Sequence, residues 1–327
     1  MVVSKERIEA HIEEWKKKIS NQKKKSWPKF IYHAADARVI KKILESGQLI
    51  PRNMQKTPMV HDVASPEALK NNPDALNYSR FYFRPRTLFH IRTEGIRCLD
   101  DKKRKGFDHE GQMSIPVMLC FDLLSISRMK EVFFTEKGYA CLNTAKGNDD
   151  EFFNKIDFCS VYHDSETNED KVRKKRMAEV VVAVPVSIKE HLKFIFCRTL
   201  YDKITLLTLL NEKELKNYHD IIKVAAVPES IFCHSLALFI RDLKFYNTSL
   251  LIKLKHPSDS SLNSYRVKII QKNNSETLIE KDLTFEKSEA FYEVTGFFNQ
   301  KECSWEIHIE EVLAFLGYIP SEKSEII

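Results

Sequence analysis

The apolar pattern of this 327-residue chain changes near residue 243, and that change restricts the possible folds more than any other feature. Before it, helical spacings alternate with short apolar runs that are typical of buried strands. After it, apolar and polar residues alternate, as in residues 250–254 and 265–269, between breaks rich in Pro, Ser and Asn. We therefore expect an α+β domain over residues 1–242 and a smaller β-rich domain over residues 243–327.

Individual helices and strands can be placed within this outline. Residues 5–25 carry apolar residues at spacings of three and four among Lys and Glu, which predicts an amphipathic helix. Residues 38–46 predict a second helix, and Gly47 stands where a left-handed residue would end it. The polar residues 51–79 predict a long loop. Strands are predicted at residues 30–33, 81–83, 115–122, 131–135 and 177–186, and a closing helix at residues 309–318.

The composition excludes several classes of protein. Apolar residues make up 43% of the chain, which is enough for a buried core and excludes a largely disordered chain. No run of about 18 uncharged apolar residues exists, and the first residues lack the apolar stretch of a signal peptide, so no membrane span is expected. The seven cysteines include no Cys-x-x-Cys pair, and we expect reduced thiols in a cytoplasmic protein without a metal site.

Two further features bear on function. The formal net charge of +6 permits a nucleic-acid partner but does not demonstrate one, because 46 acidic residues are interspersed. The chain has only 8 Gly and neither a G-x-G-x-x-G nor a Walker A sequence, so the usual phosphate-binding loops are absent.

One carboxylate stands at the head of the most apolar predicted strand. Glu179 precedes three valines and follows the basic run 173–176. Burial of an unpaired carboxylate is costly, so this side chain should be paired, exposed at a sheet edge or facing a cleft. The pattern alone favours the edge position, a solvated turn for the basic run, and a hydrogen-bonded core role for His33.

Four segments in order along residues 30–240 resemble motifs of the DarT family, bacterial ADP-ribosyltransferase toxins that modify bases in nucleic acid. One of them, residues 81–87, is similar to the family pattern Phe-Tyr-Phe-x-Pro-Arg-Ser/Thr. The chain departs from the family where Ala35 replaces a Thr and Tyr139 replaces a His, and residues 53–79 contain no arginine. These departures bear on the acceptor base more than on the class of enzyme. The other three segments are Tyr32-His33 with residues 43–49, residues 133–140 and residues 173–180.

The resemblance implies an ADP-ribosyltransferase-like split β core with flanking helices, and transfer of ADP-ribose from NAD. It implies that Glu179 is the catalytic carboxylate, which stabilises positive charge on the ribose and can accept a proton from the attacking base. No metal is expected. The resemblance implies that NAD contacts Tyr32, His33, Tyr82, Phe83 and Arg86, and that nucleic acid contacts Thr135, Tyr139, Arg173, Lys174, Lys175 and Arg176.

The resemblance also implies partners: a single-stranded nucleic acid and a cognate antitoxin, in a toxin–antitoxin or phage-defence system. The acceptor is a base of DNA or of RNA, and DNA is favoured because most of the family modifies DNA. Two alternatives stay open. One is a non-catalytic module with the same fold that binds nucleic acid or an antitoxin, and the other is an enzyme that ADP-ribosylates proteins.

Overall fold

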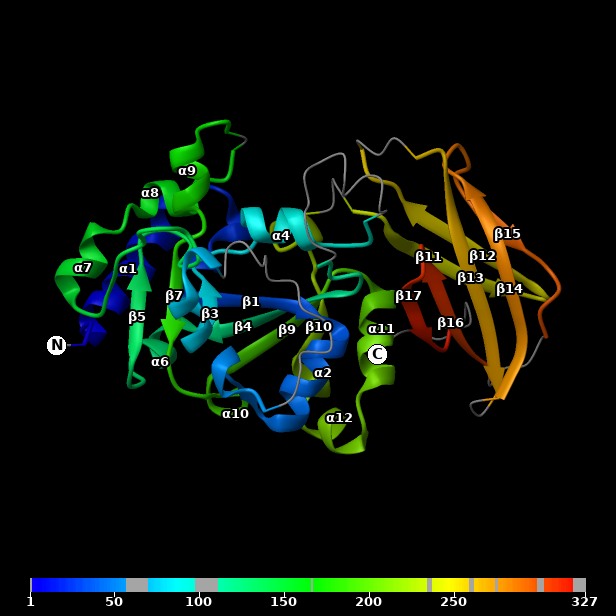
Figure 1. The fold of residues 1–327 in the computed structure, drawn as a ribbon, viewed down its shortest axis with the longest axis horizontal. Helices are drawn as coiled ribbons and strands as arrows, with labels where there is room; N and C mark the ends of the chain where they lie inside the picture. Colours follow the sequence, from blue (N-terminus) through cyan, green and yellow to red (C-terminus); the bar gives the residue numbers. More distant parts are fainter. Residues whose placement is uncertain are drawn as a thin grey trace.

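The computed structural model has a large mixed sheet with helices around it, followed by two smaller sheets (Figure 1). This arrangement confirms the expected α+β core and the β-rich C-terminal part. In the described part of the chain, no helix combines the length and the apolar character needed to cross a membrane. The structure describes residues 2–56, 70–97, 111–165, 167–233, 237–258, 262–273, 276–298 and 303–319.

The large sheet has eight strands in the order β10-β9-β4-β1-β3-β7-β5-β6. The β10–β9 pair is parallel and the other neighbouring pairs are antiparallel. In chain order the strands are β1 (Phe30–Asp36), β3 (Ser79–Tyr82), β4 (Pro116–Asp122), β5 (Val132–Thr135), β6 (Lys146–Gly147), β7 (Glu179–Val182), β9 (Leu192–Cys197) and β10 (Ile222–Val224).

Strand β7 occupies the interior of this sheet because its side chains suit burial on both faces. Its three valines are β-branched and 0% exposed, and the strand pairs with β3 on one side and β5 on the other. The strand predicted at residues 177–186 is shorter in the structure, where it covers only Glu179–Val182. Pro185 lies between it and the next strand, β8 (Val186–Ser187). Strand β8 pairs instead with β2 (Gln48–Leu49).

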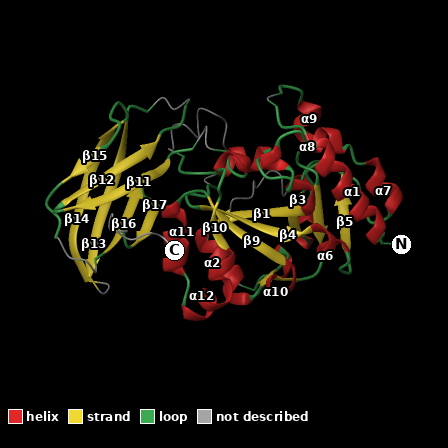
Figure 2. Ribbon diagram, turned by 180° about the vertical axis from the view of Figure 1, so that it is seen from behind, coloured by secondary structure: helices red, strands yellow, loops and turns green. Residues whose placement is uncertain are grey.

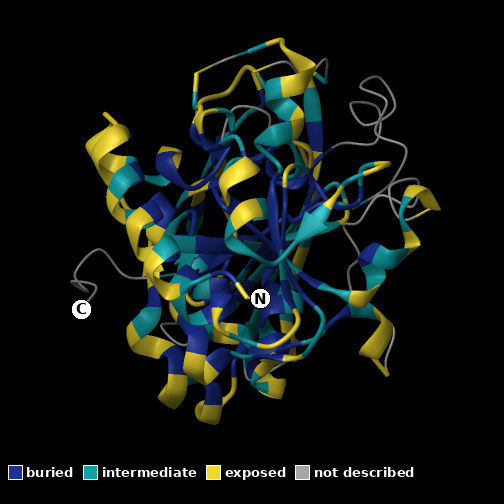
Figure 3. Cartoon of the chain, turned by 90° about the vertical axis from the view of Figure 1, so that its left-hand side faces the viewer, coloured by how far each residue is buried: buried dark blue, intermediate teal, exposed yellow. Residues whose placement is uncertain are grey.

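The helices gather in groups around the sheet. Figure 2 shows α1, α7, α8 and α9 at the end of the sheet that carries β5. It shows α2, α11 and α12 together near β10. Figure 3 shows the buried strands at the centre and exposed residues on the outer faces of the helices. The helices are α1 (Lys5–Lys18), α2 (Ala37–Ser46), α4 (Leu88–Thr93), α6 (Leu123–Ser127), α7 (Asp150–Lys155), α8 (Phe158–Tyr162), α9 (Asp170–Lys175), α10 (Ile188–His191), α11 (Leu200–Leu209) and α12 (Glu212–Tyr218).

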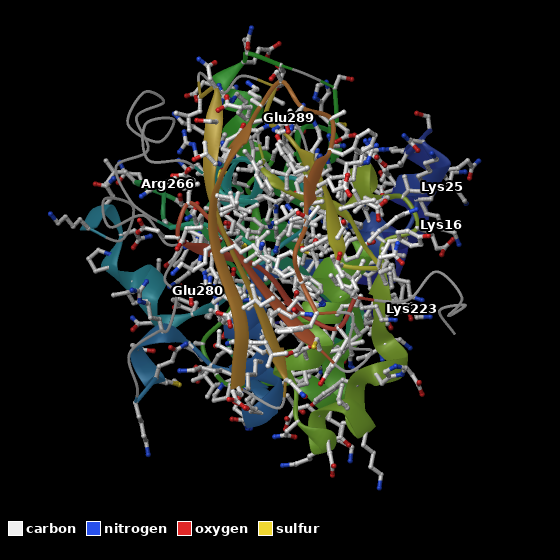
Figure 4. All side chains as sticks on the ribbon, turned by 90° about the vertical axis from the view of Figure 1, so that its right-hand side faces the viewer. Lys16, Lys25, Lys223, Arg266, Glu280 and Glu289 are labelled. Atoms are coloured by element: carbon white, nitrogen blue, oxygen red, sulfur yellow. The ribbon has the colours of Figure 1, made fainter. Side chains whose placement is uncertain are left out.

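The C-terminal part is built from two antiparallel sheets, in the orders β11-β12-β15 and β14-β13-β16-β17. Their inner faces share one apolar core, in which the rings of Phe245 and Trp305 lie 5.0 Å apart between the two sheets. In Figure 4 this part faces the viewer, with Arg266, Glu280 and Glu289 labelled on it. The strands are β11 (Phe239–Tyr246), β12 (Ser249–Lys255), β13 (Ser264–Asn273), β14 (Glu276–Glu286), β15 (Tyr292–Val294), β16 (Ser304–Ile309) and β17 (Val312–Gly317).

The two parts meet at α11. The Tyr201 hydroxyl lies 2.5 Å from Asp242 Oδ1 and 2.9 Å from the carbonyl oxygen of Leu243. From the end of β17, the backbone N–H of Leu316 donates to Thr205 Oγ1 at 3.0 Å. The predicted division between residues 242 and 243 lies within β11, and the division into two domains stays a prediction.

Several local predictions can be compared with the structure. Gly47 ends α2 with φ 69, as expected, and the N-terminal helix ends earlier than predicted, at Lys18. The predicted closing helix at residues 309–318 is wrong. Glu310 and Glu311 both have positive φ and form a tight turn, so the apolar residues after them return as strand β17. The predicted loop 51–79 contains short 3-10 turns, and residues 57–69 lie outside the described residues.

Candidate active site

The carboxylate of Glu179 is fully buried and paired. Its side chain is 0% exposed, and Arg80 donates to both oxygens, from Nε at 2.9 Å and from Nη2 at 2.6 Å. Such a two-point contact fixes the orientation of the carboxylate and supplies the countercharge that burial requires. The Arg80 side chain is 24% exposed, so the ion pair approaches the surface on the arginine side. The edge-exposed position favoured by the pattern alone is therefore wrong.

The neighbouring strand β5 holds the backbone of Glu179. The N–H of Glu179 donates to Thr135 Oγ1 at 2.9 Å, and the Thr135 hydroxyl lies 2.7 Å from the carbonyl oxygen of Lys137. Thr135 is 0% exposed. The structure therefore places this predicted nucleic-acid contact beneath the carboxylate, where its hydroxyl fixes the start of β7 and the chain that follows β5.

Strand register places a row of side chains beside the carboxylate. Tyr82 lies directly opposite Glu179, and Tyr32 lies directly opposite Tyr82. Paired residues on antiparallel strands project from the same face of a sheet. The Tyr82 ring stacks on Phe89 with ring centroids 5.9 Å apart, and burial together with the negative charge of Glu179 raises its pKa well above the ordinary value. Tyr82 therefore stays protonated beside the carboxylate.

His33 is tied to the same arginine through the backbone. Its Nδ1 lies 3.0 Å from the carbonyl oxygen of Arg80, so the neutral ring donates from Nδ1 and keeps Nε2 as an acceptor. Burial lowers the pKa of His33, against the smaller effect of this hydrogen bond. A half-buried neutral imidazole thus lies one strand away from the Arg80–Glu179 pair.

Three predicted contacts are buried. Tyr32 is 1% exposed, and Phe83 is 0% exposed and stacks on Phe134 with ring centroids 6.1 Å apart. Tyr139 is buried as well, and its hydroxyl donates to the carboxylate of Asp74. In this conformation these side chains fill the core or hold loops, and none offers a free face to a ligand.

The basic run 173–176 forms the end of α9, and its residues have different partners. Lys174 pairs with Asp170 at 2.6 Å, and Lys175 pairs with Asp157 at 2.7 Å. Arg173 lies in the last turn of α9, where Lys and Arg favour the helix C-terminus. Arg176 contacts His163 instead of a carboxylate. Arg86, predicted to contact NAD, lies 3.5 Å from Asp164.

Sequence reasoning left the partner of Glu179 open. Arg80 and Glu179 are 99 residues apart, and only the pairing of β3 with β7 brings them together. The sequence shows that Arg80 stands two residues before Tyr82 and so shares its face of the strand, but it does not show which strand lies beside that one. The described residues include no group of three or more His, Cys, Asp or Glu side chains arranged to hold a metal ion.

Comparisons with known proteins identify the family and the fold. Residues 32–232 match the family model described as DarT, ssDNA thymidine ADP-ribosyltransferase. One similar structure is Thermus sp. 2.9 DarT in complex with ADP-ribosylated ssDNA, at 17% identity and a TM-score of 0.50, covering 63% of this chain and 97% of that one. A search of curated proteins found no match.

Two further similar structures have lower scores. Thermus sp. 2.9 DarT in complex with NAD+ is 16% identical, with a TM-score of 0.46, and covers 60% of this chain and 95% of that one. Thermosipho africanus DarTG in complex with ADP-ribose is 14% identical, with a TM-score of 0.44, and covers 70% of this chain and 56% of that one.

Proposed function

The chain belongs to the DarT family of ssDNA thymidine ADP-ribosyltransferases and is an NAD-dependent enzyme, and we propose that Glu179 is its catalytic carboxylate and thymidine in single-stranded DNA its acceptor. One observation supports the site above all others. Within the matched segment, a fully buried carboxylate stands at the head of an interior strand and is oriented by a bidentate arginine. Burial of a carboxylate costs free energy even when it is paired, and buried ionisable groups with a specific charge partner are typical of functional sites.

The proposed chemistry follows from the charge on Glu179. NAD supplies the ADP-ribosyl group, and its ribose becomes positively charged as nicotinamide leaves. Glu179 would stabilise that charge, hold the ribose 2′-hydroxyl, and accept the proton that the base nitrogen loses. Each carboxylate oxygen accepts one hydrogen bond from Arg80 and has the capacity for another, so Glu179 could bind a hydroxyl once the groups that bury it move aside.

Arg80 both supports and restrains this carboxylate. Its positive charge makes burial of Glu179 tolerable, but it also offsets part of the negative charge that a cationic ribose would meet. Movement of the guanidinium away from Glu179 on substrate binding would strengthen that attraction. Thr135 and Tyr82 would keep the strand and the carboxylate in place during this movement, and His33 would hold the backbone carbonyl of Arg80 through its Nδ1–H.

Replacement of Glu179 by Gln tests the assignment, since it keeps the size and removes the charge. We expect Glu179→Gln to lower transfer of label from NAD to a thymidine-containing single strand by about 100-fold or more. Glu190→Gln is the matched control, because the side chain of Glu190 is 71% exposed and lies in α10. Circular dichroism would establish that both variants fold. Near-normal transfer by folded Glu179→Gln would overturn the catalytic role.

The acceptor is tested with matched oligonucleotides. We expect labelling of single-stranded DNA that contains thymidine, and much weaker labelling of the same strand without thymidine or of the RNA equivalent. Equal labelling of the RNA equivalent would contradict the proposed specificity for DNA. Labelling of protein alone would favour the alternative that the enzyme modifies proteins.

We further propose that the enzyme acts as a toxin held in check by an antitoxin, in a toxin–antitoxin or phage-defence system. Membership of the DarT family supports this setting. Induced expression should arrest growth, and Glu179→Gln should not. Growth at the normal rate during expression of the active chain, without any protective partner, would contradict the proposal.

A further inference from the structure

Four cationic side chains gather around a single carboxylate beyond the ends of β3 and β7. Asp164 accepts hydrogen bonds from Lys24 Nζ and from Arg84 Nη2, and Arg86 Nη1 lies 3.5 Å from its Oδ2. Arg176 contacts His163, the residue before Asp164. We call Lys24, Arg84, Arg86, Arg176 and Asp164 the Asp164 cluster.

The positive charge of the Asp164 cluster is not balanced within the described residues. Among them, Asp164 is the one carboxylate within 4.0 Å of any of the four cations. Burial, and then the charges of Arg176 and Arg86, lower the pKa of Arg84 to about 9. Burial and neighbouring arginines also lower the pKa of Lys24 and of Arg176. The cations therefore repel one another, and an added anion would relieve that repulsion.

The arginines of the Asp164 cluster also keep unused donors. The Nε atoms of Arg86 and Arg176 are buried and have no hydrogen-bond partner in the described part of the chain. Arg86 has a positive φ of 59. Residues other than glycine rarely adopt this backbone conformation, and those that do are found preferentially at ligand sites. By contrast, Arg84 is fixed, because it stacks on Trp27 at 4.5 Å and donates to the carbonyl oxygen of Pro85 at 2.9 Å.

The Asp164 cluster adjoins the candidate active site through the backbone. Phe83 continues β3 and donates its N–H to the carbonyl oxygen of Ala178, the residue before Glu179. Arg84 and Arg86 follow Phe83, and Arg176 precedes Ala178 by two residues. The segments that bear Arg84, Arg86 and Arg176 are therefore direct extensions of the strands that bear Arg80 and Glu179.

We propose that the Asp164 cluster binds a phosphate group of a substrate beside Glu179. The inference rests on the proposed function, since both substrates of that reaction, the DNA strand and NAD, contain phosphates. Arginines with free donors and uncompensated charge suit a phosphate oxygen, which accepts several charge-assisted hydrogen bonds. Binding there would place the substrate strand or the dinucleotide next to the reacting ribose.

The experiment compares Arg86→Gln and Arg176→Gln with Lys155→Gln in the 327-residue chain. Lys155 is the matched control, because it is exposed, already paired with Glu151 and outside the predicted binding residues. Each variant is made in the Glu179→Gln background for binding and in the active background for kinetics. Binding of a thymidine-free single strand is measured by fluorescence anisotropy between 50 and about 200 mM salt, a range over which phosphate contacts strongly affect affinity.

The two arms distinguish the source of the phosphate. If the strand provides it, each cluster variant lowers the slope of log affinity against log salt by about 0.7, and Lys155→Gln leaves it unchanged. If NAD provides it, the slope stays the same and KM for NAD rises roughly tenfold in the cluster variants. An unchanged slope together with an unchanged KM would overturn the proposal.

The binding arm is independent of the catalytic proposal, because it uses the Glu179→Gln background and needs no transfer. Loss of transfer in Glu179→Gln, with both the salt slope and the KM for NAD unchanged in the cluster variants, would preserve the proposed function and remove the phosphate site. The opposite result would preserve the phosphate site alone. Thermal unfolding of each variant excludes loss of folding as the cause, and Arg86→Lys should restore part of the binding, because it keeps the charge but not the planar donors.

Discussion

At the residue scale, the contacts of Glu179 show how a charged carboxylate can be buried at the head of an interior strand. Its charge is offset by Arg80, its backbone N–H is taken by Thr135, and Tyr82 stands opposite it. These contacts come from the two strands that flank β7, since Arg80 and Tyr82 belong to β3 and Thr135 belongs to β5. The carboxylate is therefore placed by the sheet as a whole, and its orientation depends chiefly on the arginine.

A double-mutant cycle measures how strongly the pair is coupled. Arg80→Ala leaves Glu179 buried without a partner, so we expect it to lower the free energy of unfolding by about 3 kcal/mol, the lower end for a buried pair because the Arg80 side chain is 24% exposed. Glu179→Leu alone leaves the arginine with access to solvent and should cost less. The double variant Arg80→Ala, Glu179→Leu should recover much of the loss. Urea unfolding provides the measurement, and independent effects of the two substitutions would contradict the coupling.

At the element scale, local sequence signals predicted most of the helices and strands that position the site. The order in which the strands pair in the sheet determined the contacts between them. Gly47 predicted the end of α2 correctly, and the valines after Glu179 predicted an interior strand. No local signal states that β3 lies beside β7, so the Arg80–Glu179 contact could not be derived. The apolar residues of β17 fit a short helix equally well until the turn at Glu310 and Glu311 sets their direction.

The contact between α1 and α8 should make the fold sensitive to acid. His11 in α1 is buried, its Nε2 lies 3.0 Å from the hydroxyl of Tyr162, and burial followed by the charge of Arg7 lowers its pKa to about 3. Between pH 6.5 and about 3 the unfolded chain binds a proton at His11 that the folded chain does not. The free energy of unfolding therefore falls as the pH falls, by about 2 kcal/mol from this residue between pH 6.5 and 5.

Replacement of His11 by Asn isolates this effect, because Asn cannot take up the proton. We expect His11→Asn to be less stable than the parent at pH 7.5, through lost packing, but to lose less stability on acidification to pH 5. Urea unfolding at the two pH values gives both differences. Identical losses in parent and variant would show that His11 does not contribute to the acid sensitivity.

At the scale of the whole molecule, charge is divided between the two parts. Residues 1–238 contain 41 Lys and Arg against 32 Asp and Glu, whereas residues 239–327 contain 11 against 14. An anionic strand is therefore attracted to the part that carries Glu179 and is not attracted to the β-rich part. Figure 4 shows Glu280 and Glu289 on that β-rich part. This division agrees with a substrate-binding sheet and a C-terminal part whose task is separate from phosphate binding.

The junction at α11 makes a final prediction about how the two parts depend on each other. Gly317 ends β17 with φ 143, and a Cβ added there would lie 2.7 Å from both Ile204 Cγ2 and Thr208 Oγ1 of α11. Gly317→Ala should force β17 away from the helix and weaken the hydrogen bond from Leu316 to Thr205, so we expect a loss of about 2 kcal/mol in the free energy of unfolding.

Gly296→Ala is the matched control for the junction. Gly296 also has a positive φ, of 80, but its added Cβ would meet only the flexible end of Lys281, at 3.1 Å. Both variants share the backbone strain, so the difference between them reports the contact with α11. Scanning calorimetry should show Gly317→Ala separating into two unfolding transitions while Gly296→Ala keeps the pattern of the parent. If both variants lost stability equally and kept the parent's pattern, β17 packing against α11 would not couple the two parts.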